Sequence, residues 1–325
     1  MNSDSKILIT GAKSYVGTRL GIWLSNSGFS NVHGLAGTKQ GIDLGQDSDL
    51  GWAFDMNPEI VVHLATRPPS KTNSLDYPAG LMYENILITS RVMEEARLSG
   101  CKKFISLWDS CCYPDIPMIP FKESDLWDGS PHWTKRYYGN SARVMMEMSM
   151  AFATQFPDIV FVNLIAPEIY GPYSDFNPNK NKIIENAISN IRAAQNANLD
   201  IDISGQAKIT RDFLFITDAL SAIEEVILNV NESSTYNISE GSDYSIKSIH
   251  EMLAEICEFE NVINWEEGEE IDVQKRSCLN TNLIQKETNW KPRVTLKEGL
   301  AETIKYHDEN LEAKYLRHDS IIEQR

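Results

Sequence analysis

Long apolar segments are absent from this chain of 325 residues. No stretch approaches the roughly 20 apolar residues that a membrane-spanning helix needs, and residues 1–6 are polar and lack the apolar segment of a signal peptide. Cysteine is scarce as well, because the five cysteines show no pattern of spacings, which predicts free thiols in a reducing compartment. We therefore expect a cytoplasmic protein that does not bind membranes.

Positive charge is also in short supply. Lysine and arginine total 30 against 46 aspartate and glutamate residues, which gives a net charge of −16. A surface of this sign argues against general binding to nucleic acid. The six histidines are scattered and no Cys/His cluster has the spacing of a zinc site, so no metal is expected.

The sequence does contain an alternation of short β-branched runs and helical stretches. This alternation predicts a parallel sheet covered on both faces, that is, a doubly wound, Rossmann-like α/β fold. The expected strands are residues 6–10, 31–35, 60–64, 103–108 and 159–165, and the expected helices between them are 15–27, 79–99 and 137–155. Further helices are expected at residues 183–194, 218–229, 245–259 and 296–309.

The expected domains follow from this pattern. Residues 1–170 should form a nucleotide-binding domain, to which a segment near 205–240 returns, and residues 171–325 should form mainly a smaller α/β substrate lobe. The acid-rich stretch 251–272 is interpreted as a solvated surface. Ligands of parallel sheets bind beyond the carboxyl ends of the strands, so the residues just after each strand are the candidates for ligand binding.

A glycine-containing turn follows the first expected strand and opens the first helix. Gly11 and Gly17 fit a G-x-x-G-x-x-G spacing whose middle position is Ser14. Such a turn lets backbone amides approach a pyrophosphate, although an ordinary strand–turn–helix connection can look the same. Its place at the first turn of an α/β chain favours dinucleotide binding, by Gly11, Lys13, Ser14, Tyr15, Val16 and Gly17.

The end of the second strand normally selects between NAD and NADP. No acid follows Leu35 at once, whereas Lys13 and Lys39 are available to pair with a 2′-phosphate, unless they are ordinary surface lysines. We therefore predict NADP rather than NAD. Asp43, next to Leu44, is expected to accept a hydrogen bond from the adenine amino group.

Further motifs, in their order along the chain, carry a family resemblance. The chain resembles the extended short-chain dehydrogenase/reductases, also called the NAD-dependent epimerase/dehydratase family, and within it most resembles the GDP-L-fucose synthases and related nucleotide-sugar epimerase/reductases. The motifs are residues 10–17, 63–65, 85, 109–114, 123–126, 138–141, 170–172, 175–178, 211–213, 217–218, 290–292 and 296–299.

The resemblance implies an NAD(P)-dependent enzyme that modifies a nucleotide sugar, as a 4-keto-sugar reductase or epimerase. The loop at residues 176–181 favours a GDP-linked sugar. The resemblance also implies a homodimer built through a helix bundle, for which the helices at 79–99 and 137–155 are the candidates. Further cofactor contacts implied by it are Leu64, Ala65, Asn85 and Tyr138.

The family's catalytic Ser, Tyr and Lys are only partly matched. Tyr138 matches the tyrosine, but the lysine four residues later is replaced by Ala142 and the serine by Asp109. Ser110 could substitute for the serine, and a shifted register would put Arg143 at the lysine position. Asp109 could act as a base or merely cap a turn, and both interpretations stay open.

GDP-fucose synthases also use a cysteine and a histidine as an acid/base pair for epimerisation. By resemblance, Cys111 matches the cysteine and Lys182 occupies the histidine position, and Glu168 replaces an asparagine before Tyr-Gly-Pro. Cys111 could equally be a small core residue. The expected substrate contacts are Glu168, Asn177, Lys182, Arg211 and Arg276.

The sequence is also consistent with two functions other than that of a nucleotide-sugar reductase or epimerase. The loss of the lysine and the serine favours a non-catalytic protein that binds NAD(P) or a nucleotide sugar, since a fold does not guarantee activity. A lyase or dehydratase without net redox change is the other. In either case an acidic protein must hold its anionic ligands with local positive charge, so the following bases are expected in one cleft: Lys13, Lys39, Arg143, Lys182, Arg211 and Arg276.

Overall fold

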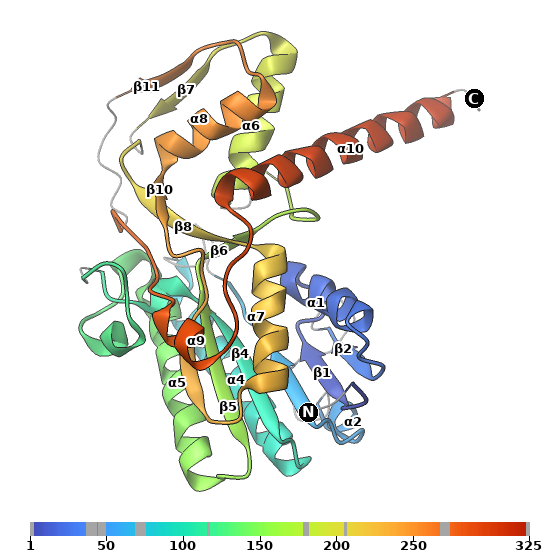
Figure 1. The fold of residues 1–325 in the computed structure, drawn as a ribbon, viewed down its shortest axis with the longest axis vertical. Helices are drawn as coiled ribbons and strands as arrows, with labels where there is room; N and C mark the ends of the chain where they lie inside the picture. The colour runs from blue at the N-terminus through green and yellow to red at the C-terminus, as the bar shows by residue number, and fades with distance from the viewer. Residues whose placement is uncertain are drawn as a thin grey trace.

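The structure is a computed structural model. It describes residues 3–36, 44, 50–68, 76–115, 118–177, 182–204, 207–266 and 274–322, with side chains up to residue 310. Figure 1 shows two lobes stacked along the long axis, and the chain crosses between them several times.

A six-stranded parallel sheet forms the core of the larger lobe. The strand order is β2-β1-β3-β4-β5-β9, and all five neighbouring pairs are parallel. The chain adds β2 on one side of β1 and β3 on the other, so the strand order reverses between β1 and β3. This reversal is the switch point of a doubly wound fold, and the predicted fold class is confirmed. The strands are β1 (Ile7–Thr10), β2 (Val32–Leu35), β3 (Ile60–His63), β4 (Lys103–Asp109), β5 (Val160–Ala166) and β9 (Ser234–Asn237).

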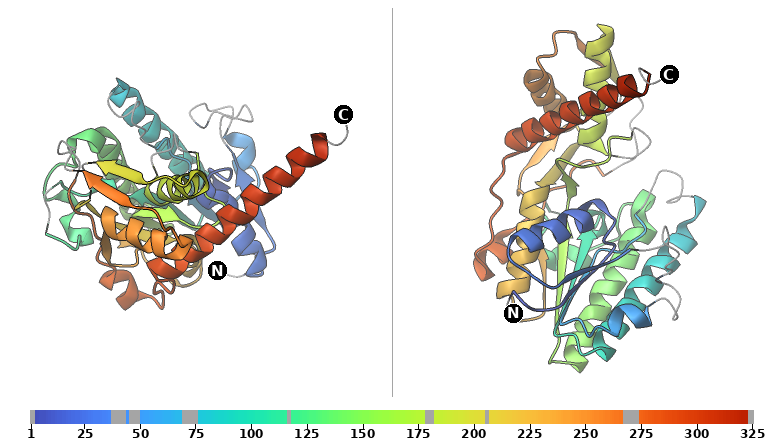
Figure 2. Two further views of the ribbon diagram at one scale, coloured as in Figure 1. Left: turned by 90° about the horizontal axis from the view of Figure 1, so that it is seen from above. Right: turned by 90° about the vertical axis from the view of Figure 1, so that its right-hand side faces the viewer.

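Helices cover both faces of this sheet, as the two views of Figure 2 show. Alternate residues of a strand point to opposite faces, and β3 accordingly sends Ile60 and Val62 into one hydrophobic cluster and Val61 into the other. The first face carries α1 (Tyr15–Asn26) and α7 (Ile216–Asn229), and the second carries α2 (Gly51–Phe54), α4 (Pro78–Leu98) and α5 (Arg136–Gln155).

The smaller lobe contains two short sheets and three helices. One sheet has the order β10-β8-β6, and the other pairs β11 with β7. In Figure 1 the last helix, α10, projects away from the body. The elements are β6 (Glu168–Tyr170), β7 (Ile201–Ser204), β8 (Thr210–Phe215), β10 (Asp243–Ser245), β11 (Ile263–Glu266), α6 (Ile183–Ala197), α8 (Ile246–Cys257) and α10 (Leu296–Ile322).

Four short helices complete the described part, of which η3 and η5 contact α5, and η4 and α9 contact β9. They are η3 (Ser110–Cys112), η4 (Glu123–Trp127), η5 (Trp133–Lys135) and α9 (Asn282–Glu287). Within residues 205–240, α7 and β9 belong to the large lobe, whereas β8 belongs to the small three-stranded sheet. The domain division near residue 170 stays a prediction.

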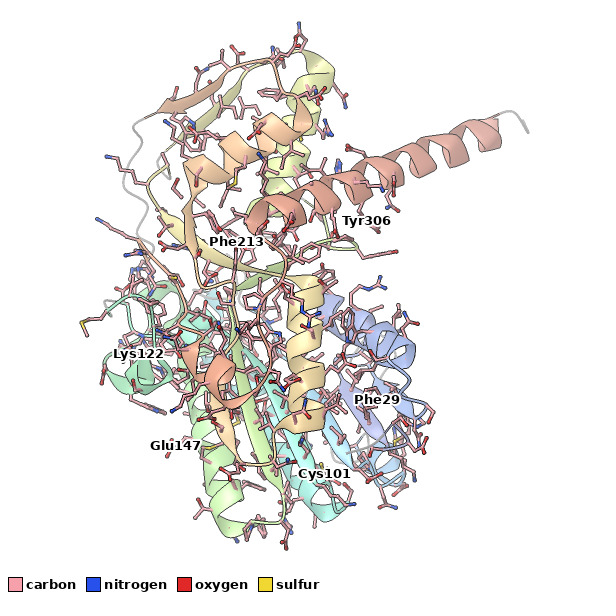
Figure 3. The ribbon with its side chains drawn as sticks, viewed as in Figure 1. Phe29, Cys101, Lys122, Glu147, Phe213 and Tyr306 are labelled. Atoms are coloured by element: carbon pink, nitrogen blue, oxygen red, sulfur yellow. The ribbon has the colours of Figure 1, made fainter. Side chains whose placement is uncertain are left out.

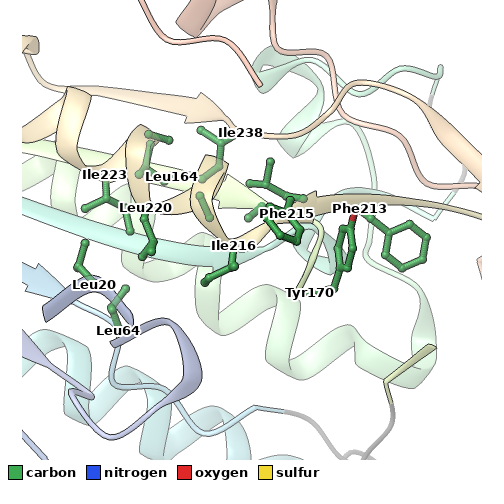
Figure 4. Packing of buried hydrophobic residues seen from close by; sticks show 14 of the residues in the cluster. Leu20, Leu64, Leu164, Tyr170, Phe213, Phe215, Ile216, Leu220, Ile223 and Ile238 are labelled. Atoms are coloured by element: carbon green, nitrogen blue, oxygen red, sulfur yellow. The ribbon is translucent and has the colours of Figure 1, made fainter. Parts of the chain in front are cut away.

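An aromatic cluster lies where the two lobes meet. The Tyr170 ring packs edge-on against Phe213 and Phe215, with centroids 6.1 and 5.5 Å apart, and Figure 4 shows these rings continuing the core of the large lobe. A Cβ on Gly299 of α10 would lie 2.2 Å from the Tyr170 hydroxyl oxygen, so only glycine lets α10 approach here. Figure 3 places Phe213 between the lobes and Cys101 at the opposite end of the sheet.

Asp218 joins two motifs that are far apart in the sequence. Its Oδ2 accepts hydrogen bonds of 3.0 Å from the backbone amides of Arg293 and Val294, and the Trp290 indole donates to its backbone oxygen. The motifs at residues 217–218 and 290–292 therefore have a structural role, because together they hold the C-terminal segment against α7.

Lys103 begins β4 and is a fully buried lysine. Its Nζ donates 2.8 Å hydrogen bonds to the carbonyls of Val226 and Ile227 in the last turns of α7. Burial lowers the pKa of this amine to about 8. A neutral amine still has two hydrogens for the two carbonyls, so losing its proton need not cost either hydrogen bond.

A pH-dependent stability follows from this arrangement. Because the folded pKa lies below the unfolded value of about 10.4, the unfolded chain binds more protons between about pH 8 and 10.4. We expect the unfolding free energy of the wild type, relative to Lys103→Met, to rise across this range. Urea unfolding of both proteins at pH 7.5, 8.5 and 9.5 checks this, and a constant or falling difference would contradict it.

Candidate active site

The glycine turn has the close backbone approach that its motif predicts. Gly11 has a φ of 70°, and a Cβ there would lie 2.7 Å from the backbone of Leu64, while a Cβ on Gly17 would lie 2.3 Å from the Gly11 oxygen. Ser14 caps α1, because its hydroxyl accepts a 3.0 Å hydrogen bond from the Gly17 amide. The turn therefore leaves no room for side chains at either glycine, which fits a loop that a pyrophosphate approaches.

The other predicted cofactor residues are distributed around this turn. Lys13 is exposed, Tyr15 and Val16 open α1, and Leu44 is buried. The Tyr15 hydroxyl donates to the carbonyl of Pro172, 3.1 Å away, and so ties α1 to the start of the smaller lobe. Lys39 and Asp43 lie outside the described residues, and the predicted contacts to the 2′-phosphate and the adenine remain predictions.

Asn85 fixes the loop that follows β3. Its side-chain amide accepts from the Arg67 amide at 2.8 Å and donates to the carbonyls of Arg67 and Leu81. This holds the segment with Leu64, Ala65 and Thr66 over the end of the sheet. Asn85 was predicted to bind the cofactor, and the structure shows it positioning the loop that carries two other predicted cofactor residues.

Tyr138 lies in the first turn of α5 and is 5% exposed. A Cβ on the next residue, Gly139, would be 2.7 Å from the Cys111 oxygen, so this turn packs directly against η3. Burial raises the pKa of Tyr138 well above its usual value, and the nearby Asp109 and Cys111 raise it further, while the Thr66 hydroxyl lowers it. The predicted tyrosine is therefore brought together with Asp109 and Cys111.

Asp109 ends β4 and caps η3. Its Oδ1 accepts a 2.7 Å hydrogen bond from the Cys111 amide, while Ser110 opens η3 and is half-buried. The turn-capping interpretation of Asp109 is thus present in the structure. Burial and then Asp109 raise the pKa of the Cys111 thiol well above its usual value, so this thiol stays protonated at neutral pH.

The structure does not support Arg143 as a replacement for the missing lysine. Its guanidinium donates 2.6 Å hydrogen bonds to the carbonyls of Cys112 and Gly129 and lies over the Trp127 ring. These bonds hold the segment before α5 in place. Ala142, at the lysine position, is 1% exposed and belongs to the hydrophobic cluster beneath α5.

Lys135 is a residue that the sequence reasoning missed. It is the last residue of η5, three positions before Tyr138, where the family spacing expects nothing. The pKa of its ammonium is raised, first by the charge of Asp109; burial and Arg211 oppose this effect, and Glu168 adds to it. The sequence shows a lysine directly before the helix that carries Tyr138, but only the fold shows that the charges of Asp109 and Glu168 act on it.

Arg211 and Glu168 complete the same group from β8 and β6. Glu168 and Asp109 raise the pKa of Arg211 against the larger effect of burial, which lowers it. Glu168 accepts a 2.9 Å hydrogen bond from the Ile183 amide, and burial, followed by the charge of Glu185, raises its pKa to about 8. The carboxyl end of β4 and the strands β6 and β8 of the smaller lobe thus contribute charged side chains that influence one another's pKa.

Lys182 lies beside this group but is held by its own partners. Its Nζ donates to Ser174 at 2.6 Å and to the buried Glu185 at 2.9 Å, and it lies 4.9 Å from the Tyr15 ring centre. The Ser174 hydroxyl donates to the same carboxylate. Lys182 therefore neutralises Glu185, and its ammonium is held by Ser174 and Glu185.

Two predicted substrate residues are not placed in this group. Arg276 is exposed and forms an ion pair of 2.7 Å with Asp243, and Asn177 is an exposed loop residue whose amide donates to Asp175. The bases expected in one cleft are thus only partly brought together. The described part of the acid-rich stretch belongs to α8 and β11, at the far end of the smaller lobe in Figure 1.

Comparison with known proteins identifies relatives of the whole chain. It is 27% identical over 313 residues to a protein named probable GDP-L-fucose synthase 1 from Oryza sativa subsp. japonica, covering 95% of this chain and 94% of that one. It is 24% identical over 245 residues to the GDP-L-fucose synthase of Escherichia coli (strain K12), covering 72% and 75% of the two chains.

Solved structures share the fold. A GDP-mannoheptose C4 reductase from Campylobacter jejuni with NADP bound has a TM-score of 0.85 at 22% identity, covering 95% of this chain and 99% of that one. A GDP-L-fucose synthetase from Naegleria fowleri bound to NADP has a TM-score of 0.83 at 18% identity, covering 96% and 95%. The model of the NAD dependent epimerase/dehydratase family matches residues 7–239, and the chain therefore belongs to that family.

Proposed function

We propose that this protein is an NADPH-dependent enzyme that reduces the 4-keto group of a nucleotide-linked sugar, with GDP as the nucleotide. The observation that carries the proposal is the position of Tyr138, which is buried in the first turn of α5, where that turn packs against η3 directly after β4. The names of the relatives support GDP-sugars and NADP.

The residues present fit a dinucleotide. The turn before α1 is so closely packed that a Cβ at Gly11 or Gly17 would clash with backbone atoms, which fits a glycine turn that brings a pyrophosphate to the N-terminus of α1. The exposed Lys13 is placed on the same turn to pair with a phosphate. NADPH, when bound, supplies the hydride that reduces the carbonyl carbon.

The chain itself supplies the proton. As the carbonyl carbon gains its hydride, Tyr138 donates its proton to the oxygen and so completes the hydroxyl group. Burial of the phenol keeps this proton in place at neutral pH until the substrate oxygen becomes basic enough to take it. We assign the binding of the substrate's phosphate or sugar oxygens to Arg211, as the family resemblance implies; its side chain is half-buried at β8.

The geometry supports reduction better than epimerisation. Epimerisation needs a base to remove a proton next to the keto group, but the Cys111 thiol is held in its protonated form. Lys182, at the position of the partner acid, is tied to Ser174 and Glu185. A reductase that leaves the neighbouring carbons unchanged is therefore the function we favour.

The assay uses GDP-4-keto-6-deoxymannose and NADPH in deuterated water. We expect NADPH consumption and a reduced GDP-sugar with no deuterium at C3 or C5. Deuterium at these carbons would indicate epimerisation, and a new product at constant NADPH would indicate a lyase. A thermal shift with NADPH but no turnover on GDP-, dTDP-, UDP- or CDP-linked 4-keto-sugars would favour a non-catalytic binding protein. The replacement of the family's lysine by Ala142 supports that alternative.

We also propose the homodimer that the resemblance implies and the cytoplasmic location that the amino-acid sequence predicts. The neighbouring helices α4 and α5 each carry an exposed apolar side chain, Tyr83 and Val144, which supports these helices as the interface. No helix in the described ranges is both long and apolar enough to cross a bilayer.

A further inference from the structure

We propose that His63 is a positioning residue for the cofactor, through which α4 holds the loop after β3 against the glycine turn and so strengthens NADPH binding. This inference rests on the proposed function and deepens its cofactor site. It concerns a chain of three polar side chains inside the large lobe, all of them fully buried: Thr10, His63 and Thr89.

The polar chain crosses three elements of the fold. Thr10 ends β1 and His63 ends β3, and the two residues are direct neighbours in the parallel register of these strands. The Thr10 Oγ1 lies 2.8 Å from the His63 Nδ1, and the His63 Nε2 lies 3.0 Å from the Oγ1 of Thr89 on α4. The imidazole therefore connects the ends of two neighbouring strands to the helix that covers them.

Both ring nitrogens of His63 depend on these threonines. Burial lowers the pKa of His63 to about 3, so the ring is neutral. A neutral imidazole has one nitrogen that donates and one that accepts. One threonine hydroxyl therefore donates to the ring and the other accepts from it, and removal of either hydroxyl leaves a buried ring nitrogen without that partner, which is costly.

The helix α4 holds both ends of the loop that follows β3. Thr89 bonds to His63 at the start of the loop. Asn85, one turn earlier on the same face of α4, accepts from the Arg67 amide at 2.8 Å and donates to the Arg67 carbonyl at 3.1 Å. Residues 64–66, which include two predicted cofactor contacts, lie between these two anchor points.

The same loop packs directly against the glycine turn. The Leu64 amide donates to the Thr10 carbonyl at 3.1 Å. A Cβ on Gly11 would lie 2.7 Å from the carbonyl carbon and oxygen of Leu64, so the two segments have no free space between them. His63 and Thr10 directly precede the two segments that touch, and their hydrogen bond therefore fixes the spacing of the turn that a pyrophosphate approaches.

The test is the NADPH affinity of Thr89→Val, a change that removes the hydroxyl and keeps the branched shape of the side chain. We expect the Kd for NADPH, measured by fluorescence titration, to rise roughly 3- to 10-fold, the factor that one buried hydrogen bond contributes. The KM for NADPH should rise in parallel, while kcat at saturating NADPH should change less. Thr89→Ser keeps the hydroxyl and should restore the affinity. Wild-type affinity of Thr89→Val would overturn the proposal.

A double-mutant cycle with His63→Leu shows whether Thr89 acts through the imidazole. In the His63→Leu background no ring nitrogen needs the hydroxyl, so Thr89→Val should not weaken NADPH binding further. An equal loss of affinity with and without His63 would overturn the proposal, because Thr89 would then act by another route.

Thr303→Val is the matched control. Thr303 is also a fully buried threonine within a helix, but it belongs to α10 of the smaller lobe, where its hydroxyl donates to the Gly299 carbonyl at 2.6 Å. Its replacement removes the same atom and should leave the NADPH affinity unchanged. If Thr303→Val weakens NADPH binding as much as Thr89→Val does, the loss reflects overall stability and the proposal fails.

A second readout requires neither NADPH nor turnover. Because Thr89→Val releases one anchor of the loop, hydrogen exchange of the Leu64 amide in the cofactor-free protein should be faster than in the wild type. Mass spectrometry of the peptide that contains residues 63–67 measures the rate. If the wild type binds NADPH but reduces no 4-keto-sugar, the proposed function fails and the affinity test still applies; if the exchange rate is unchanged in Thr89→Val, the positioning role of His63 fails.

Discussion

Replacement of Tyr138 by phenylalanine is expected to lower kcat by about 100- to 10,000-fold, the contribution of a positioned proton donor. The ring is 5% exposed in the first turn of α5 and would keep its packing, so folding and NADPH binding should be close to those of the wild type. NADPH oxidation with the 4-keto-sugar measures the loss. Thermal shift with NADPH measures the binding.

Tyr137 is the matched control for this change. It lies one position earlier on the same helix and is 47% exposed. Tyr137→Phe should therefore retain full activity. Wild-type turnover by Tyr138→Phe, or an equal loss in the two variants, would refute the assignment of Tyr138 as the proton donor.

Replacement of Gly17 by alanine is expected to disrupt the dinucleotide turn. The new Cβ would lie 2.3 Å from the Gly11 oxygen and 2.9 Å from the Ala12 Cα, and both are backbone atoms that cannot move independently of the loop. We expect a loss of stability of about 1–3 kcal/mol, as for overpacked sites, and a large loss of NADPH affinity. Urea unfolding and fluorescence titration with NADPH measure the two effects.

Gly21 provides the control on the same helix. A Cβ there meets nothing within 4 Å, so Gly21→Ala should stabilise the protein by about 0.5–1 kcal/mol through helix propensity alone. Opposite signs for the two variants are the expected result. If Gly17→Ala binds NADPH as the wild type does, the turn does not hold a pyrophosphate.

The large lobe could be predicted from the sequence because its signals are local. β1, β3, β4 and β5 are short apolar runs, and β4 and β5 were placed to within one residue at either end. β9, with the mixed sequence Ser-Thr-Tyr-Asn, was not predicted. The strands of the smaller lobe were missed. β6 and β10 have three residues each, too few for an alternating pattern to be recognised, and their pairing is long-range.

The site could be predicted where it depends on the position of a residue within a motif, and less well where it depends on the orientation of a side chain. Tyr138 and Asp109 follow from alignment with the family, and the fold places them together. The interpretation of Arg143 failed because one step along a helix turns a side chain by about 100°, toward the carbonyls of Cys112 and Gly129. Lys135 could not be identified, because no spacing rule connects η5 to β4.

The position of β9 has a consequence for synthesis of the chain. Its partner in the sheet, β5, ends at Ala166, whereas β9 spans Ser234–Asn237. While the ribosome adds the intervening segment, which takes several seconds at about 5–20 residues per second, the outer edge of β5 has no partner strand. An open, apolar edge of this kind can pair with another nascent chain. The length of the segment between β5 and β9, which forms β6, α6, β7, β8 and α7, therefore also sets how long the newborn sheet stays prone to aggregation.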